Sequence, residues 1–236
     1  MRIRIWAATA LFALAAAVIG VRASQAVSSK NDEPQVDPAR FESQIAAFEA
    51  NDAKNTPPRD AVLFVGSSSI RMWPTAKHFP EFAVINRGFG GSHISDVAHF
   101  ADRIVHSYKP RAIFFYAGDN DIAAGKSSER VLADYRQFAD TVQKQLPGTP
   151  IVFIAIKPSL ARWAKWPTMR DANRLVEDYC RSSERLEYVD IATPMIGANG
   201  QPRRELFIED GLHLSDAGYR VWVDAVTPVL KRVLKR

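Results

Sequence analysis

From Arg59 onward, short runs rich in β-branched and other apolar residues alternate with longer amphipathic stretches. This alternation is typical of βα units built around a parallel sheet. Five runs are predicted to be strands: Ala61–Val65, Ala83–Asn86, Ala112–Ala117, Ile151–Ile156 and Leu186–Ile191. Because each run is nearly all apolar, we expect helices on both faces of the sheet. The chain is therefore predicted to be an α/β protein with a five-stranded parallel sheet.

The stretches between the strands have helical spacing of apolar residues. We expect helices at Ile94–Tyr108, Ser127–Leu146, Thr168–Cys180 and Ser215–Leu234, with one more at Phe41–Ala50 before the first strand. In the first of these, Val97, Phe100, Ala101 and Ile104 share one face. Ligands of such sheets bind beyond the carboxyl ends of the strands, so the loops that follow the strands are where chemistry is expected.

Length, charge and cysteine content narrow the class of protein. A chain of 236 residues is sufficient for one domain with a sizeable core. The formal net charge is +5, but Arg2, Arg4 and Arg22 precede any acidic residue, so the remaining chain is nearly balanced and nucleic-acid binding is not indicated. The single cysteine, Cys180, excludes an intrachain disulfide and a cysteine-rich zinc site.

The N-terminal 26 residues have the three-part pattern of a secretory signal. Met1–Arg4 is basic, Ile5–Val21 is apolar, and Ser24-Gln25-Ala26 offers a cleavage site. The apolar run is at the lower limit for a membrane span, so the alternative is an uncleaved anchor. We expect export to the periplasm or the medium, with membrane contact only through such an anchor. Residues 27–38 are predicted to be a linker, and residues 39–236 the folded domain.

Four loops carry residues that together could form a hydrolytic site. They are Gly66-Ser67-Ser68, Gly88-Phe89-Gly90-Gly91, Gly118-Asp119-Asn120-Asp121 and Asp210-Gly211-Leu212-His213. A serine hydroxyl becomes a good nucleophile when an imidazole takes its proton and a carboxylate orients that imidazole. Ser68, His213 and Asp210 could fill these roles. The backbone N–H groups of Ser68 and Gly91 and the Asn120 amide could donate to an oxyanion, and glycine at 91 removes a Cβ that would block close approach.

In these four blocks and their order, the sequence resembles the SGNH hydrolases, also called GDSL-type esterases and lipases. The resemblance spans about Ala61 to Tyr219. It implies a three-layer α/β/α flavodoxin-like sandwich, no cofactor, no metal, and the same five site residues in the roles given above. One residue departs from the family pattern: Ser67 stands where the family usually has aspartate. We expect its hydroxyl to replace part of the hydrogen bonding of that aspartate.

Several alternatives stay open beside this interpretation. Ser67 and Ser69 are rival nucleophiles, and His93 is a rival base without an acid three residues before it. The stretch from Gly118 to Gly125-Lys126-Ser127 resembles a phosphate loop, but it has six residues between its glycines where that motif has four. Asp119 and Asp121 are instead expected to shape the turn that presents Asn120.

Substrate contacts are predicted at Arg71, His93, Arg162 and Trp163, of which the last two belong to the loop Lys157–Trp166 after the fourth strand. That loop could cover an acyl group or attract an anion, or its aromatic residues could pack over the sheet edge. The predicted function is an exported serine esterase acting on short-chain or acetyl esters, including O-acetylated glycans. The alternatives are a lysophospholipase-type esterase and a non-catalytic glycan-binding protein on the same fold. The sequence leaves the oligomeric state undetermined.

Overall fold

A computed structural model describes residues 37–235. The predicted leader, residues 1–26, and the predicted linker up to residue 36 lie outside the described residues. Pro38, the last residue of the predicted linker, is the first residue of the 3-10 turn η1 (Pro38–Phe41). Among residues 37–235, no helix combines the length and the apolar character that crossing a membrane requires.

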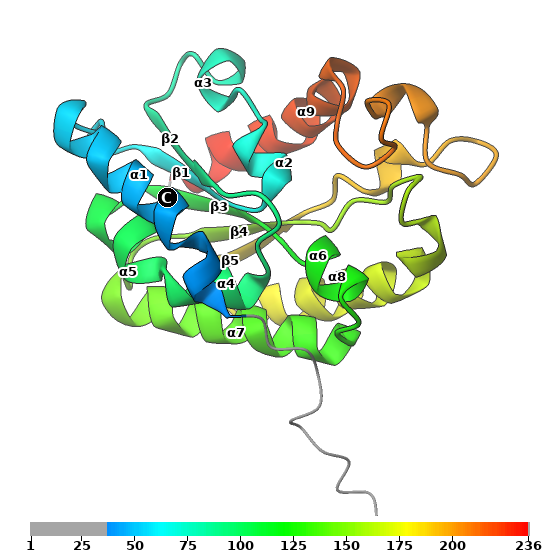
Figure 1. The fold of residues 1–236 in the computed structure, drawn as a ribbon, viewed down its shortest axis with the longest axis horizontal. Coiled ribbons are helices and arrows are strands. Elements are labelled where there is room, and N and C mark those ends of the chain that lie inside the picture. The colour runs from blue at the N-terminus through cyan, green and yellow to red at the C-terminus, as the bar shows by residue number, and fades with distance from the viewer. Residues whose placement is uncertain (1–36, 236) are drawn as a thin grey trace, which may run out of the picture. The chain divides into compact units, whose positions relative to one another are not determined.

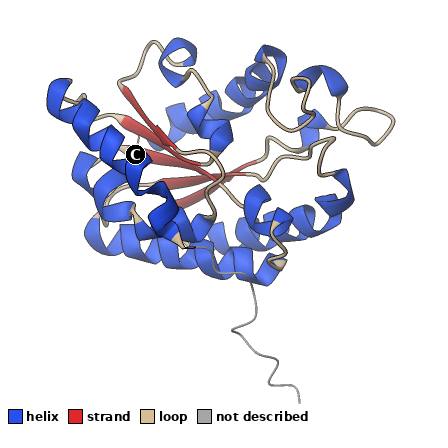
Figure 2. Ribbon diagram, viewed as in Figure 1, coloured by secondary structure: helices blue, strands red, loops and turns tan. Residues whose placement is uncertain are grey.

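The five predicted strands form one parallel sheet (Figures 1 and 2). The strands are β1 (Val62–Gly66), β2 (Val84–Gly88), β3 (Ala112–Tyr116), β4 (Ile151–Ile154) and β5 (Leu186–Val189). Their order across the sheet is β2-β1-β3-β4-β5, which is the flavodoxin-like order. The chain leaves β1 toward one edge and returns past it to β3, so the β1 and β3 ends mark the switch point where such folds bind ligands.

Helices cover both faces of the sheet, which completes the three-layer arrangement (Figure 1). One face is covered by α1 (Glu42–Lys54), α4 (Ile94–His99), α5 (Ala101–Ile104), α7 (Ser128–Gln145) and α8 (Trp166–Cys180). The other is covered by α2 (Ser68–Arg71) and α9 (Asp216–Val233), while α3 (Thr75–His78) lies beside β2. In β3 the alternation is plain: Phe115 joins the first core and Phe114 the second, and both are fully buried.

Helix ends follow local capping chemistry. Ser127 and Ser215 precede α7 and α9, and each hydroxyl accepts a hydrogen bond from the backbone N–H three residues later, at 3.2 and 3.3 Å. The short helix α6 (Asp119–Ala123) begins directly after β3, where Gly118 takes a φ of +119° that only glycine adopts readily. The two serine caps and Gly118 thus determine where α7, α9 and α6 begin.

The prediction of one helix over Ile94–Tyr108 is wrong. The segment is divided into α4, α5 and the 3-10 turn η2 (His106–Tyr108). The break lies at Phe100, a buried residue with φ −93° and ψ 8°, whose ring packs edge-on against Phe89. The predicted apolar face is nonetheless correct, because Val97, Phe100, Ala101 and Ile104 all lie in the first core.

Candidate active site

The turn after β1 presents Ser68 at the switch point of the sheet. Gly66 has a φ of +141°, and a Cβ on it would lie 1.8 Å from the carbonyl oxygen of Tyr116, so no other residue fits there. The backbone N–H of Ser67 donates to that same carbonyl at 2.9 Å. Ser68 then begins α2 and is partly exposed. The packing of β1 against β3 thus fixes where this hydroxyl lies.

A continuous hydrogen-bonded chain joins Ser68, His213 and Asp210. Ser68 Oγ lies 3.0 Å from His213 Nε2, although 145 positions separate the two residues. His213 Nδ1 lies 2.6 Å from Asp210 Oδ2. The other carboxylate oxygen of Asp210 accepts hydrogen bonds from the backbone N–H groups of Leu212 and His213, at 2.8 and 2.9 Å. The spacing of three residues between acid and imidazole therefore allows one tight turn to hold both.

Asp210 is ionised across the ordinary pH range. Desolvation acts to raise its pKa, but hydrogen bonds from the His213 ring and the two backbone N–H groups outweigh it and lower the pKa to about 2. A carboxylate in this state holds the proton of the imidazole on Nδ1 and leaves Nε2 to accept a proton from Ser68.

Ser67 and Ser69, the rival nucleophiles, are 0% and 1% exposed. The expectation that the Ser67 hydroxyl takes over hydrogen bonds of the family's aspartate is wrong, because among the described residues its buried Oγ finds no partner. Ser67 is instead bonded to β3 through its backbone, whose N–H donates to the carbonyl of Tyr116.

The loops after β2 and β3 bring Gly91 and Asn120 into one region. Asn120 Nδ2 donates to the backbone carbonyl of Ser92, the residue after Gly91, at 3.1 Å. Gly91 has a φ of +84° and is exposed, and a Cβ on it would meet no protein atom within 4 Å. The protein therefore needs glycine at 91 for its backbone conformation. Since no protein atom lies near that position, the missing Cβ could make room only for a bound substrate.

The two acids beside Asn120 shape the turn through different partners. Both carboxylate oxygens of Asp121 accept from the backbone N–H of Ile94 at 3.2 Å, and Lys126 Nζ donates to Asp121 at 2.8 Å. Asp119 is paired with Lys157 and Arg162 at 2.9 and 3.2 Å. Lys126 is thus buried in ion pairs, the second of them with Asp134 at 2.7 Å. This use of Lys126 leaves no phosphate-binding cation at that position.

The predicted substrate residues have different surroundings. Arg71 is exposed, and its guanidinium lies against Gly90, where an added Cβ would come within 2.9 Å of Cζ. Trp163 stacks on Trp166 with ring centroids 6.1 Å apart. His93 is buried, and its burial, aided by the charge of Lys126, lowers its pKa to about 4. Substrate contact by these residues stays a prediction.

Sequence reasoning missed the buried ion cluster around Asp119. Lys157 is 1% exposed and reaches both Asp119 and the hydroxyl of Tyr116, the latter at 3.1 Å. Burial acts to raise the pKa of Asp119, but the charges of Lys157 and Arg162 outweigh it and hold that pKa below its usual value. The available signal was the cationic loop Lys157–Trp166 starting at the same edge of the sheet as the acidic turn.

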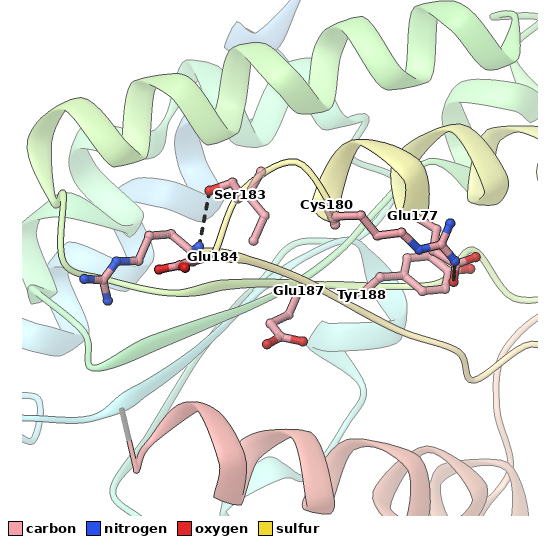
Figure 3. A pocket seen from close by; sticks show the side chains of 9 residues that line it. Glu177, Cys180, Ser183, Glu184, Glu187 and Tyr188 are labelled. Carbon is pink, nitrogen blue, oxygen red and sulfur yellow. Dashed lines mark hydrogen bonds and ion pairs between the residues drawn. The ribbon is translucent and has the colours of Figure 1, made fainter.

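A separate groove lies where α8 ends and β5 begins (Figure 3). It is lined by Glu177, Cys180, Ser183, Glu184, Tyr188 and neighbouring residues. Burial raises the pKa of the Cys180 thiol to about 12, so this sulfur is not a nucleophile at neutral pH. The groove is at the amino end of β5, whereas Ser68 and Asn120 follow the carboxyl ends of their strands. No cluster of metal-ligating side chains occurs within residues 37–235.

The sheet order and the Ser–His–Asp geometry are those of α/β hydrolytic enzymes with a serine at the switch point. The sequence profile of the GDSL-like lipase/acylhydrolase family matches residues 70–221, and the chain belongs to this family, which is that of the SGNH hydrolases. By its family it is a carboxylic ester hydrolase. The matched range includes Gly91, Asn120, Asp210 and His213, and it begins two residues after Ser68.

Solved structures show the same fold at low sequence identity. A GDSL-like lipase from Bacteroides thetaiotaomicron is 17% identical, with a TM-score of 0.66 over 83% of this chain and 98% of that one. A carbohydrate esterase family 3 protein from Talaromyces cellulolyticus is 15% identical, with a TM-score of 0.61 over 74% and 97%. A variant of Axe2, an acetyl-xylooligosaccharide esterase from Geobacillus Stearmophilus, is 16% identical, with a TM-score of 0.60 over 72% and 94%. No curated protein matches the sequence.

Proposed function

We propose that this protein is an exported serine esterase that hydrolyses short-chain or acetyl esters, with O-acetylated glycans as the natural substrate class. The observation that carries the proposal is the hydrogen-bonded chain from Ser68 through His213 to Asp210, with distances of 3.0 and 2.6 Å. These three hydrogen-bonded side chains supply a nucleophile, a base and an orienting acid in the order that acyl transfer requires.

In the proposed mechanism, Ser68 Oγ attacks the ester carbonyl while His213 Nε2 takes the hydroxyl proton. Asp210 stabilises the imidazolium that forms. The tetrahedral intermediate places its negative charge on the former carbonyl oxygen, where the N–H groups of Ser68 and Gly91 and the Asn120 amide would donate. His213 then gives its proton to the leaving alcohol, and the acyl group stays on Ser68. Water, activated by the same imidazole, releases the acid and restores the serine.

The substrate class rests on chemistry at the site and on two structural neighbours. The neighbours named as a carbohydrate esterase and an acetyl-xylooligosaccharide esterase support an acetylated glycan. Asp210 is 42% exposed and His213 23% exposed at their side chains, so the acid and base lie at the surface, which suits a bulky polar alcohol bearing a small acyl group. The rival substrate is a lysophospholipid, in line with the neighbour named as a GDSL-like lipase.

The first experiment measures hydrolysis of p-nitrophenyl acetate by the wild type and by Ser68→Ala. Losing the nucleophile should lower turnover by about 10³–10⁶-fold. Ser67→Ala is the matched control, because it removes a neighbouring hydroxyl that has no hydrogen-bond partner among the described residues. Equal rates in the wild type and Ser68→Ala would refute the proposal, and inactivity of the wild type on every ester would favour the non-catalytic glycan-binding alternative.

Two further measurements test the finer parts of the proposal. Asn120→Ala should lower kcat by about 10²–10³-fold if its amide binds the oxyanion, and an unchanged kcat would remove it from that role. A panel of esters that varies acyl length and alcohol, with acetylated xylo-oligosaccharides and lysophospholipid as its end members, ranks the substrate classes.

Export is tested by mass spectrometry of the protein from cells that express the full chain. A mature N-terminus near residue 27 in the periplasm or medium supports cleavage and release. An N-terminus at Met1 in the membrane fraction supports an anchor, and a protein confined to the cytosol with Met1 intact would refute export.

A further inference from the structure

Arg162 uses its two terminal nitrogens on two adjacent residues of the turn after β3. Nη2 donates to the side-chain oxygen of Asn120 at 3.0 Å, and Nη1 lies 3.2 Å from Asp119 Oδ2. The side chain of Arg162 is 20% exposed. The first contact is a hydrogen bond and the second an ion pair without one. A planar guanidinium holds its two terminal nitrogens in a fixed relation to each other, which a flexible ammonium group cannot do.

These contacts define which way the Asn120 amide points. Arg162 has only donors, so the atom facing it must be the amide oxygen, and the Ser92 carbonyl has only acceptors, so the atom facing it must be Nδ2. Turning the amide over would place donor against donor and acceptor against acceptor. One hydrogen of Nδ2 is used by Ser92, and the second is available to another acceptor.

The cluster around Asp119 also carries a net positive charge beside that amide. One buried carboxylate, Asp119, is shared by two cations, Lys157 and Arg162. Because charge interactions are strong where water is excluded, the surplus positive charge favours negative charge on a nearby oxygen.

The loop that carries Arg162 also touches the turn that carries the acid and the base. The backbone N–H of Ala161 donates to the carbonyl of Gly211 at 3.1 Å. Leu160 packs so closely on Gly211 that a Cβ added there would lie 3.2 Å from Leu160 Cβ. Three consecutive residues, 160 to 162, thus connect the Asp210–His213 turn with Asn120.

We propose that Arg162 is a positioning residue for ester hydrolysis: it fixes the Asn120 amide with its nitrogen toward the oxyanion and holds positive charge behind it. This inference rests on the proposed function. It replaces substrate attraction as the role of Arg162, because Nη2 donates to Asn120, and Nη1, which makes no hydrogen bond among the described residues, is ion-paired with Asp119.

The test is a double-mutant cycle with Arg162→Gln, Asn120→Ala and the double variant, assayed for kcat and KM on p-nitrophenyl acetate. Arg162→Gln should lower kcat by about 10–100-fold with little change in KM, since it removes one charge-assisted hydrogen bond and a charge. Because Arg162 acts largely through Asn120, Arg162→Gln should slow the Asn120→Ala variant by a smaller factor than it slows the wild type, the remaining factor being the direct effect of the charge. Arg162→Lys should have a kcat between those of the wild type and Arg162→Gln.

Arg162→Gln leaves Lys157 paired with Asp119, so no buried carboxylate loses its last partner and the variant should fold. Circular dichroism and thermal unfolding check this, and Arg162→Lys provides the test if the glutamine variant does not fold. Arg170→Gln, which removes an exposed arginine of the following helix, is the matched control and should keep the wild-type kcat.

Two results would overturn the inference. One is an additive loss in the double variant. The other is an unchanged kcat with a raised KM confined to an anionic ester such as monoethyl succinate, which would assign Arg162 to substrate binding. Ser68→Ala, assayed in parallel, separates the two proposals. If Ser68→Ala is inactive while Arg162→Gln has the wild-type kcat, only the positioning role of Arg162 fails. If Ser68→Ala is fully active, the proposed function itself fails.

Discussion

Gly88 controls the distance between β2 and the short helix that begins with Ser68. It is the last residue of β2 and pairs with Gly66 of β1. A Cβ on Gly88 would lie 2.2 Å from the backbone nitrogen of Arg71 and 2.7 Å from the carbonyl carbon of Ile70. Ordinary contacts of this kind begin at 3.4 Å. Gly88→Ala therefore has to move α2 outward by about 1 Å, because backbone atoms cannot rotate aside as a side chain can.

The structure around α2 sets the cost of that movement. The Asn86 side-chain amide donates to the carbonyls of Ile70 and Trp73 at 2.7 and 3.1 Å, so displacement of α2 also stretches these contacts. Overpacking of this kind costs about 1–3 kcal/mol of unfolding free energy. For a domain of this size, each kcal/mol corresponds to a fall in Tm of about 2–4 °C. Ser68 moves with α2, and a misplacement of about 1 Å at a reacting group costs on the order of 10²-fold in rate.

The assay combines thermal unfolding with kcat/KM on p-nitrophenyl acetate. Gly148→Ala is the matched control, because Gly148 is exposed and an added Cβ there meets nothing within 4 Å. We expect Gly88→Ala to lose both stability and activity and Gly148→Ala to lose neither. A Gly88→Ala protein with the Tm and kcat/KM of the wild type would refute the packing of α2 on β2 described above.

Two further predictions concern ionisation. Asp210→Asn should lower kcat by about 10²–10⁴-fold. The amide can donate to Nδ1 of His213 and so stabilise the imidazole tautomer with its proton on Nε2, and in that tautomer Nε2 cannot accept the proton of Ser68. The measurement is kcat at pH 8, and a loss below about threefold would count against the role of Asp210. The pKa of His93 is depressed to about 4, so protonation favours the unfolded chain and stability falls as pH decreases from about 6.5 through 4. His93→Gln should make the difference in unfolding free energy between pH 7 and pH 4 smaller by about 1–3 kcal/mol in urea titrations, and an unchanged difference would contradict this.

The central strands β1, β3 and β4 could be predicted from the sequence because every residue in them is buried, which requires apolar side chains at nearly every position. The edge strands β2 and β5 include partly exposed residues, so their apolar runs are shorter or interrupted. The strand ends differ from the predicted ones by at most two residues, since hydrogen bonding across the sheet decides where pairing stops. The break at Phe100 was not predictable in this way, because the residues on both sides keep one apolar face, and the packing of the Phe100 ring against Phe89 is a tertiary contact that no local pattern shows.

In the site, too, contacts set by local sequence spacing could be predicted, whereas contacts set by tertiary packing could not. The Asp210–His213 hydrogen bond spans three residues, so local spacing predicts it. The link from His213 to Ser68 was inferred from the order of four motifs at strand ends, which a parallel sheet brings to one edge. By contrast, Lys157 is 38 positions from Asp119 and Arg162 is 42 from Asn120. Which of several cations in that loop reaches which acid depends on side-chain conformation, and no spacing rule supplies it.

Ser67 raises the question of what keeps the nucleophile turn rigid when the residue before Ser68 is not an acid. The Ser67 hydroxyl contributes no hydrogen bond within residues 37–235, yet its backbone N–H is bonded to Tyr116 and its carbonyl accepts from Ile70 and Arg71 at 3.0 and 3.1 Å. The Asn86 side chain secures the far end of α2 from β2. Backbone bonds and a neighbouring strand thus hold this turn without the side chain at position 67. That is why the Ser67→Ala control should retain wild-type activity, whereas Asn86→Ala, which removes the bonds from β2, should not.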